Sequence, residues 1–174
     1  ISPKQFLLSD VHLDIAHAIE TNEIDPSYLE LELTESLIAE DPEKIISMLS
    51  TLKSLGVRLS IDDFGTGYSS LSYLSQFPLD ILKIDKSFVQ KSENDKRGLA
   101  LTKAIVGIAK SLNLEVIAEG VETKEQLAIL NDLGCEYMQG FYYSAAIPSE
   151  DVSVLLNNRI NLYTQSIDKN ACSG

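Results

Sequence analysis

Residues 57–67, VRLSIDDFGTG, predict a β-strand that runs directly into a flexible turn. Residues 57–62 have the apolar, alternating character of a buried strand, and the glycines that follow are typical of a tight change of direction. Two adjacent carboxylates, Asp62 and Asp63, stand where the strand ends. Neighbouring carboxylates in a partly buried place repel each other and lose solvation. The stretch therefore predicts a compensating positive charge nearby.

The same strand–turn–helix unit recurs along the chain. Short apolar or alternating runs predict strands, and apolar residues every three or four positions predict helices. The predicted strands are residues 29–34, 57–62, 80–85, 115–119 and 137–141. The predicted helices are residues 8–21, 42–55 (with Asp41 as its cap), 69–76, 96–112 and a segment around 127–133, followed by one after Pro148. Strict alternation of strand and helix predicts an α/β fold with a parallel sheet, because a parallel return needs a crossover.

Two parallel architectures fit this order. One is an open, doubly wound sheet, and the other is a (β/α)8 barrel without its first units. A complete barrel usually needs about 200–250 residues, whereas this chain has 174. The chain also begins with Ile1 rather than Met, which favours a piece of a longer polypeptide. The spacing of the elements leaves both architectures open.

Composition narrows the classes of function. The chain is 44% hydrophobic and 23% charged, with a formal net charge of −12. Such an acidic chain is not expected to present a broad surface for DNA, RNA or anionic membranes. No apolar run approaches the roughly 18 residues of a membrane span. Cys135 and Cys172 fit neither a disulfide framework nor a zinc spacing, so a cytoplasmic location is expected.

Charged or polar residues mark the carboxyl ends of all five predicted strands. In any parallel α/β fold these ends gather on one side of the molecule. The residues concerned are Glu32 and Glu35, Asp62 and Asp63, Lys83 and Asp85, Glu119 and Glu122, and Gln139. Simpler explanations exist for individual members, such as helix-start acids or a pair between Lys83 and Asp85. The repetition at successive strand ends favours a shared site.

Clustered carboxylates with one lysine predict a particular chemistry. Hard oxygen ligands suit Mg²⁺ or Mn²⁺, and a pair of ions can share a bridging carboxylate. Two divalent ions beside a lysine are suited to phosphodiester hydrolysis, in which the lysine offsets negative charge. The run GTGYSS, residues 65–70, resembles a dinucleotide-binding loop less well, because Ser70 replaces the third glycine.

Five motifs carry a resemblance to a known family. LELTES, DDFGTGYSSLSYL, LKIDKSFV, VIAEGVET and LGCEYMQGF, in this order, resemble the EAL domain family of cyclic-di-GMP phosphodiesterases, from the start of the chain to about Leu156. The resemblance implies a (β/α)8 TIM-barrel-type fold, incomplete here because the first strands are absent. It implies hydrolysis of cyclic-di-GMP to linear pGpG with Mg²⁺ or Mn²⁺, two ions in the complete domain. It also implies a partial EAL domain over residues 1–158 and a polar tail over residues 159–174.

The resemblance also implies roles for single residues. The expected metal ligands are Glu32, Asp62, Asp63 and Glu119. Lys83 is expected to contact the attacking water, and Glu119 to act as a base or as a metal ligand, which makes these two the expected catalytic residues.

Further residues are implied as supports of the site. Glu35 is expected to anchor the loop after the aspartates, Glu122 to support Glu119, and Gln139 to belong to the site. The loop itself is expected to bend over the site and to couple it to dimerisation; its residues are Phe64, Gly65, Thr66 and Gly67.

Two departures from the family pattern bear on activity. The Glu-Ala-Leu signature and an asparagine ligand, which belong upstream of ISPKQF at residues 1–6, are absent. Ala145 and Ala146 stand where the family usually has a basic residue and a proline. We therefore expect a phosphodiesterase in the complete domain and poor activity in this piece. A non-catalytic cyclic-di-GMP receptor or protein-interaction module on the same fold is the alternative. A scaffold that binds only proteins comes third.

The expected partners follow from the same reading. They are cyclic-di-GMP, a second copy of the chain, and other domains of a longer signalling protein, which is cytoplasmic or anchored to a membrane outside this piece. No DNA or RNA partner is expected.

Overall fold

A computed structural model of the chain describes residues 10–38, 42–66 and 71–156. The chain forms two compact units, Ile1–Tyr143 and Ser144–Gly174. Within the second unit a helix covers residues 149–156, where one was predicted after Pro148. The predicted cap Asp41, the loop residue Gly67 and the predicted start of a polar tail at residue 159 lie outside the described residues.

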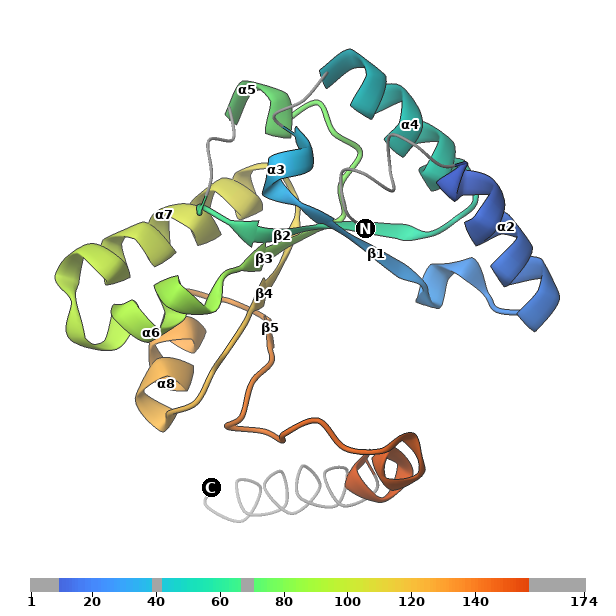
Figure 1. Cartoon of the computed structure of the whole chain (residues 1–174). Coiled ribbons are helices and arrows are strands. Elements are labelled where there is room, and N and C mark those ends of the chain that lie inside the picture. Colours follow the sequence, from blue (N-terminus) through green and yellow to red (C-terminus); the bar gives the residue numbers. More distant parts are fainter. Residues whose placement is uncertain (1–9, 39–41, 67–70, 157–174) are drawn as a thin grey trace, which may run out of the picture. The chain divides into compact units, whose positions relative to one another are not determined.

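The first unit is built on one parallel sheet (Figure 1). Its strands are β1 (Glu30–Thr34), β2 (Arg58–Phe64), β3 (Ile81–Ile84), β4 (Glu115–Ala118) and β5 (Tyr137–Met138). Each strand pairs with the next one in the chain, in the order β1-β2-β3-β4-β5. A doubly wound sheet would reverse its direction at a switch point, and this sheet does not. The strand order is that of a barrel wall, as the resemblance implied.

Helices connect the strands and lie beside the sheet. They are α2 (Val11–Asn22), α3 (Glu35–Ile38), α4 (Pro42–Ser54), α5 (Leu71–Leu74), α6 (Lys86–Asn94), α7 (Lys96–Ser111) and α8 (Lys124–Asp132), with a 3₁₀ turn η1 (Pro26–Tyr28) before β1. Right-handed crossovers between strands added in one direction place the connecting helices on one side of the sheet.

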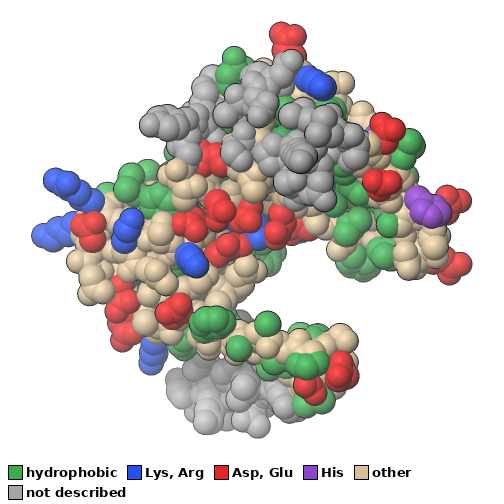
Figure 2. Space-filling view, viewed as in Figure 1, with side chains coloured by type: hydrophobic (Ala, Val, Ile, Leu, Met, Phe, Trp, Pro, Cys, Tyr) green, Lys and Arg blue, Asp and Glu red, His purple; other side chains and the backbone are tan. Residues whose placement is uncertain are grey.

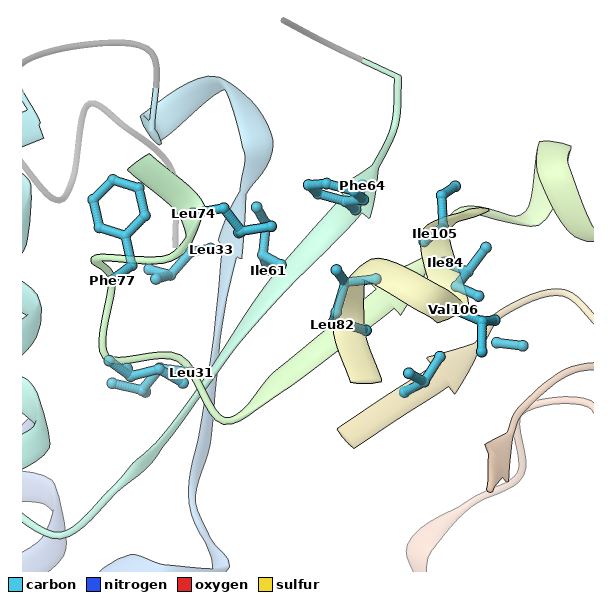
Figure 3. Packing of buried hydrophobic residues seen from close by; sticks show 14 of the residues in the cluster. Leu31, Leu33, Ile61, Phe64, Leu74, Phe77, Leu82, Ile84, Ile105 and Val106 are labelled. Carbon is cyan, nitrogen blue, oxygen red and sulfur yellow. The ribbon is translucent and has the colours of Figure 1, made fainter. Parts of the chain in front are cut away.

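The register of the sheet separates two faces of opposite character. Neighbours in a parallel ladder point to the same side, and successive residues alternate. One face carries Leu31 and Leu33, with Leu59, Ile61, Leu82 and Ile84 beside them. All six are buried and belong to the hydrophobic core, together with residues of α4 and α7. Figure 3 shows part of this packing, with Ile61 and Leu82 of the sheet and Val106 of α7. The other face carries the ionic residues of the same strands.

The sequence interpretation missed the single-turn helix α3 and the longer helix α6. Residues 86–94 form α6, although they contain few apolar residues and were left unassigned. Asp85 explains its start, because the side chain accepts a hydrogen bond from the backbone N–H of Ser87 at 3.0 Å. Val89 is the buried apolar anchor of this helix. A single buried position gives no periodicity, so contact with the rest of the domain stabilises a helix that the pattern does not predict.

Candidate metal centre

The ionic face of the sheet has Lys83 at its centre. Its side chain is 5% exposed and reaches carboxylates that lie on, or directly after, three other strands. Lys83 Nζ lies 2.6 Å from Glu119 Oε1 and 3.7 Å from Asp62 Oδ1, and it contacts Glu32 Oε1. Figure 2 shows acidic side chains gathered over this part of the molecule. Glu32, Asp62, Asp63, Lys83 and Glu119 are called the carboxyl-end cluster below.

The charges in this cluster are unbalanced, since four carboxylates share one ammonium group. Burial alone would lower the pKa of Lys83, but the hydrogen bonds to Glu119 and Glu32 outweigh it and raise the pKa above its ordinary value. Lys83 is therefore a cation at neutral pH. Burial raises the pKa of Glu119, and the negative charges of Asp62 and Glu32 add to this rise against the opposing effect of Lys83. One lysine is thus too little positive charge for the acids around it.

Three of these acids form a group of a size suited to a metal ion. Ligand oxygens of Asp62, Asp63 and Glu119 all lie within 4.8 Å of one another. The β2–β3 register shifts between Ile61 and Phe64, so that both aspartates stand at an irregularity of the strand. Asp63 has a φ of 54°, which is uncommon for a non-glycine residue and is found at functional sites.

The donor set fits Mg²⁺ or Mn²⁺. Carboxylate oxygens are hard ligands, and they are present here in excess over cations. Burial and the charge of Asp62 raise the pKa of Asp63, and a divalent ion would relieve this repulsion. Glu32, predicted as a fourth ligand, is 51% exposed and contacts Lys83 from β1. Asp62, Asp63 and Glu119 supply carboxylate oxygens only. Among the described residues there is no other group of three or more side chains placed to bind one metal ion.

The loop after the aspartates is hydrogen-bonded to the start of α3. The backbone N–H of Gly65 donates to Glu35 Oε2 at 3.0 Å, and Glu35 is buried. Gly65 has a φ of +96°, and a Cβ there would lie 2.9 Å from the ring of Phe88, so glycine is needed at this turn. Thr66 Oγ1 donates to the Asp63 carbonyl at 2.8 Å. Glu35 thus contacts the first glycine of the loop, and its role as the anchor of the loop stays a prediction.

The remaining predicted residues lie in two different places. Gln139 Nε2 donates to Glu119 Oε1 at 2.7 Å, so Gln139 joins the cluster. Glu122 is exposed. The hydrogen bond described for its carboxylate is accepted from Gln90 Nε2 at 3.5 Å, and its backbone N–H donates to Gln126. Glu122 therefore lies among residues of α6 and α8 rather than in the described contacts of Lys83.

Asp85, which the sequence analysis counted among the charged residues at strand ends without giving it a role, is a neighbour of Asp63. A hydrogen bond to Asp85 and the charge of Asp85 contribute to the raised pKa of Asp63. The simple pairing of Lys83 with Asp85 is not what the structure shows, because the described ion pairs of Lys83 go to other acids. The position of Asp85, two residues after Lys83 at the end of β3, was the signal that could have indicated it.

Comparison with known proteins gives the family. The sequence profile described as "EAL domain" matches residues 1–146. The chain belongs to the EAL domain family. This match covers all the residues of the carboxyl-end cluster, and it agrees with the strand order seen in the sheet.

Among relatives of this EAL domain is the cyclic di-GMP phosphodiesterase NbdA of Pseudomonas aeruginosa. It is 45% identical over 135 residues, which are 78% of this chain and 17% of NbdA. The chain thus matches less than a fifth of the length of this relative.

Solved EAL structures resemble the chain closely. The PaMucR phosphodiesterase, in a cyclic-di-GMP complex, is 40% identical with a TM-score of 0.84 over 87% of this chain and 62% of that one. A manganese and cyclic-di-GMP complex of Klebsiella pneumoniae BlrP1 is 29% identical with a TM-score of 0.75, over 83% of this chain and 38% of that one. Among the described residues, no helix has the length and apolar character needed to cross a membrane.

Proposed function

We propose that this EAL domain hydrolyses one phosphodiester bond of cyclic-di-GMP to give linear pGpG, with Mg²⁺ or Mn²⁺ as cofactor and two ions in the complete domain. The observation that carries the proposal is the convergence of Glu32, Asp62 and Glu119, from three strands, on Lys83. Relatives named as phosphodiesterases and solved complexes with cyclic-di-GMP support the substrate. A relative solved with manganese supports the cofactor.

The acids and the lysine of the carboxyl-end cluster have different roles in this proposal. Asp62, Asp63, Glu119 and Glu32 would hold the divalent ions. When bound, these ions supply positive charge for the phosphate oxygens and lower the pKa of water. Lys83, protonated, cannot accept a proton; instead it orients the carboxylates and offsets negative charge that develops on the phosphorane oxygens.

Glu119 and its neighbours complete the arrangement. The raised pKa of Glu119 suits a group that exchanges a proton with water, and Gln139 fixes the orientation of its carboxylate through the 2.7 Å hydrogen bond. Glu35 fixes the loop that starts at Gly65. In this proposal Gln139 and Glu35 orient the site, Glu119 accepts the proton that the attacking water loses, and the leaving 3′-oxygen takes up that proton.

An assay of the purified protein tests the proposal. The protein is incubated with cyclic-di-GMP and Mn²⁺, and pGpG is followed by chromatography with mass detection. The expected result is pGpG that disappears with EDTA and in Asp62→Asn. Binding of cyclic-di-GMP measured by calorimetry without formation of pGpG would instead support the receptor alternative. Absence of both binding and pGpG would overturn both functions.

The location, the domain bounds and the pairing of the protein are also proposed. We propose that the domain acts in the cytoplasm within a longer signalling protein, that residues 1–158 form the EAL part and residues 159–174 a tail, and that the domain pairs with a second copy. The small share of NbdA that the chain matches supports the longer protein. Light scattering of the purified protein tests the pairing, because a dimer has twice the mass of the 19.2 kDa chain.

A further inference from the structure

The segment that carries Glu119 is fixed to both neighbouring strands. The backbone N–H of Glu119 donates to the carbonyl of Ile84 at 3.1 Å, and that of Val121 donates to the carbonyl of Gln139 at 3.0 Å. Gly120 lies between them with a φ of +67°. A Cβ at Gly120 would lie 2.5 Å from Cβ of Lys86, the first residue of α6. The backbone after β4 therefore packs directly on the start of α6.

The far end of this segment is fixed by one buried side chain. Gln126, on α8, is 4% exposed. Its Oε1 accepts hydrogen bonds from the backbone N–H groups of Glu122 and Thr123, at 2.8 and 3.2 Å. The N–H of Gln126 in turn donates to Thr123 Oγ1 at 3.1 Å. This is a capping box, and it holds the chain between Glu119 and α8.

A carboxylate from another helix accepts hydrogen bonds from both side chains of this capping box. Glu93 Oε2 accepts from Gln126 Nε2 at 3.2 Å and from Thr123 Oγ1 at 3.2 Å. Glu93 lies in the last turn of α6, where the helix dipole disfavours a negative charge. The two hydrogen bonds to α8 give a reason for an acid at this position.

Glu93 is the hydrogen-bond partner of the NH₂ group of the Gln126 amide. A carboxylate can only accept hydrogen bonds, so it faces that NH₂ group, while the amide oxygen faces the N–H groups of Glu122 and Thr123. Without an acceptor at Glu93 the buried NH₂ group loses its partner, which costs free energy and weakens the hold of Gln126 on the segment before α8.

We propose that Glu93 is a positioning residue for Glu119, acting through Gln126 on the backbone of residues 119–123. Its role in activity rests on the function proposed above, whereas its effect on the backbone and on metal binding does not. Glu93 lies outside the five motifs that mark the family. Groups that are hydrogen-bonded directly to metal ligands typically change metal affinity by about 10- to 100-fold when they are removed. Glu93 acts through Gln126 and the backbone, so an effect no larger than the lower end of that range is expected.

The test compares three variants of the protein with the wild type. Glu93→Leu removes the acceptor and keeps most of the volume, and Glu93→Gln keeps one acceptor oxygen. Asp95→Ala is the matched control, because Asp95 caps the adjoining helix α7 through the N–H of Arg97 at 2.9 Å and has no described contact with Gln126. Two quantities are measured for each: amide hydrogen exchange at Glu122 and Thr123 by NMR, and Mn²⁺ affinity by electron paramagnetic resonance.

The expected pattern separates positioning from loss of stability. Glu93→Leu should speed exchange at both amides and weaken Mn²⁺ binding about 10-fold, and Glu93→Gln should recover most of both. Asp95→Ala should lower the melting temperature and leave both quantities unchanged. The proposal would be overturned if Glu93→Leu bound Mn²⁺ as tightly as the wild type. It would also be overturned if Asp95→Ala lost as much Mn²⁺ affinity as Glu93→Leu. If Glu93→Leu does not fold, Glu93→Ala, which inserts no new apolar group, gives the same comparison.

Failure of the proposed function would look different. A protein that binds Mn²⁺ but forms no pGpG would contradict the hydrolysis of cyclic-di-GMP, and the Glu93 variants would still be judged on exchange and Mn²⁺ affinity. A wild type that binds no Mn²⁺ would contradict the metal site, and the exchange of Glu122 and Thr123 alone would then support or overturn the positioning role.

Discussion

The ionic face of the sheet has charged groups at two levels, one near the amino ends of the strands and one near their carboxyl ends. The ratio of acids to cations differs between the two levels. Near the amino ends of the strands Arg58 pairs with Glu115 at 2.8 Å and has Glu30 beside it in the sheet, which makes two acids for one cation. Near the carboxyl ends three carboxylates pair with Lys83, and a fourth, that of Asp63, lies beside two of them. The carboxyl-end level has more acids for its one cation than the amino-end level has. It therefore has the greater need of further cations. In barrels the carboxyl-end level serves chemistry and the amino-end level serves stability.

The largest difference between the levels is expected from Asp62→Asn. This change keeps the shape of the side chain and removes one negative charge from the group formed with Asp63 and Glu119. We expect Mn²⁺ affinity to fall about 100-fold, because a ligand is lost rather than one of its supports, and phosphodiesterase activity to fall with it. Calorimetry with Mn²⁺ and the pGpG assay measure the two effects.

The control for this variant is Asp132→Asn, the same change at an exposed position on α8. It should leave Mn²⁺ affinity and activity as in the wild type. Equal effects of the two variants would mean that the net charge of the protein, rather than the cluster, attracts the ion.

A second difference concerns the lysine itself. In Lys83→Met the acids of the cluster lose the cation that they share, so the metal-free protein should lose about 2 kcal/mol of unfolding free energy. Because a divalent ion can replace the missing charge, Mn²⁺ should raise the melting temperature of this variant more than that of the wild type. Thermal unfolding with and without Mn²⁺ gives both quantities.

The two levels should also respond differently to Mn²⁺. In Arg58→Met, Mn²⁺ should raise the melting temperature only as much as in the wild type. A Lys83→Met protein that is as stable as the wild type without metal would contradict the view that Lys83 is the only cation the cluster has among the described residues.

The pH dependence should have opposite signs for stability and for metal binding. Burial and neighbouring acids raise the pKa of Asp63 and Glu119 from ordinary values of 3.8 and 4.5. Such groups bind more protons in the folded than in the unfolded protein. Their contribution to the stability of the metal-free protein is complete below the ordinary values and is lost as pH rises through the raised ones. Mn²⁺ competes with protons, so its affinity should rise over the same range.

Urea unfolding and Mn²⁺ titration between about pH 4.5 and pH 7 test these signs. Glu119→Gln should reduce the pH slope of stability, because it removes one of the two groups. A wild type in which stability and Mn²⁺ affinity change in the same direction over this range would show that other carboxyl groups dominate.

The alternation of the strands allowed much of the cluster to be predicted. In a strand, Glu32 and Asp62 each point away from the apolar residues beside them, and parallel pairing brings them to one face. The position of Lys83 in β3 follows from the same rule. These are local patterns, so one sequence is enough to show them. The choice of a barrel over a doubly wound sheet came from the family motifs, and the strand order then confirmed it.

The parts that were missed depend on contacts between distant residues. α6 has too little apolar periodicity to be seen, and it is stabilised by packing. Glu93 meets Gln126 across 33 positions of the chain, and the nearness of Asp85 to Asp63 depends on the irregularity in β2. No spacing rule connects such pairs, because the pairing is set by how helices and strands pack.

The smallest effect is expected at the amino-end level, from Arg58→Gln. Arg58 and Glu115 are 35% and 42% exposed, and exposed ion pairs contribute at most about 1 kcal/mol in most proteins. Arg58→Gln, Glu115→Gln and the double variant form a cycle whose coupling energy, measured by urea unfolding, should stay within that value. Mn²⁺ affinity and pGpG formation should not change in any of the three. A tenfold loss of Mn²⁺ affinity in Arg58→Gln would show that the two levels are coupled, and that the field of the amino-end pair helps to set the charge at the metal centre.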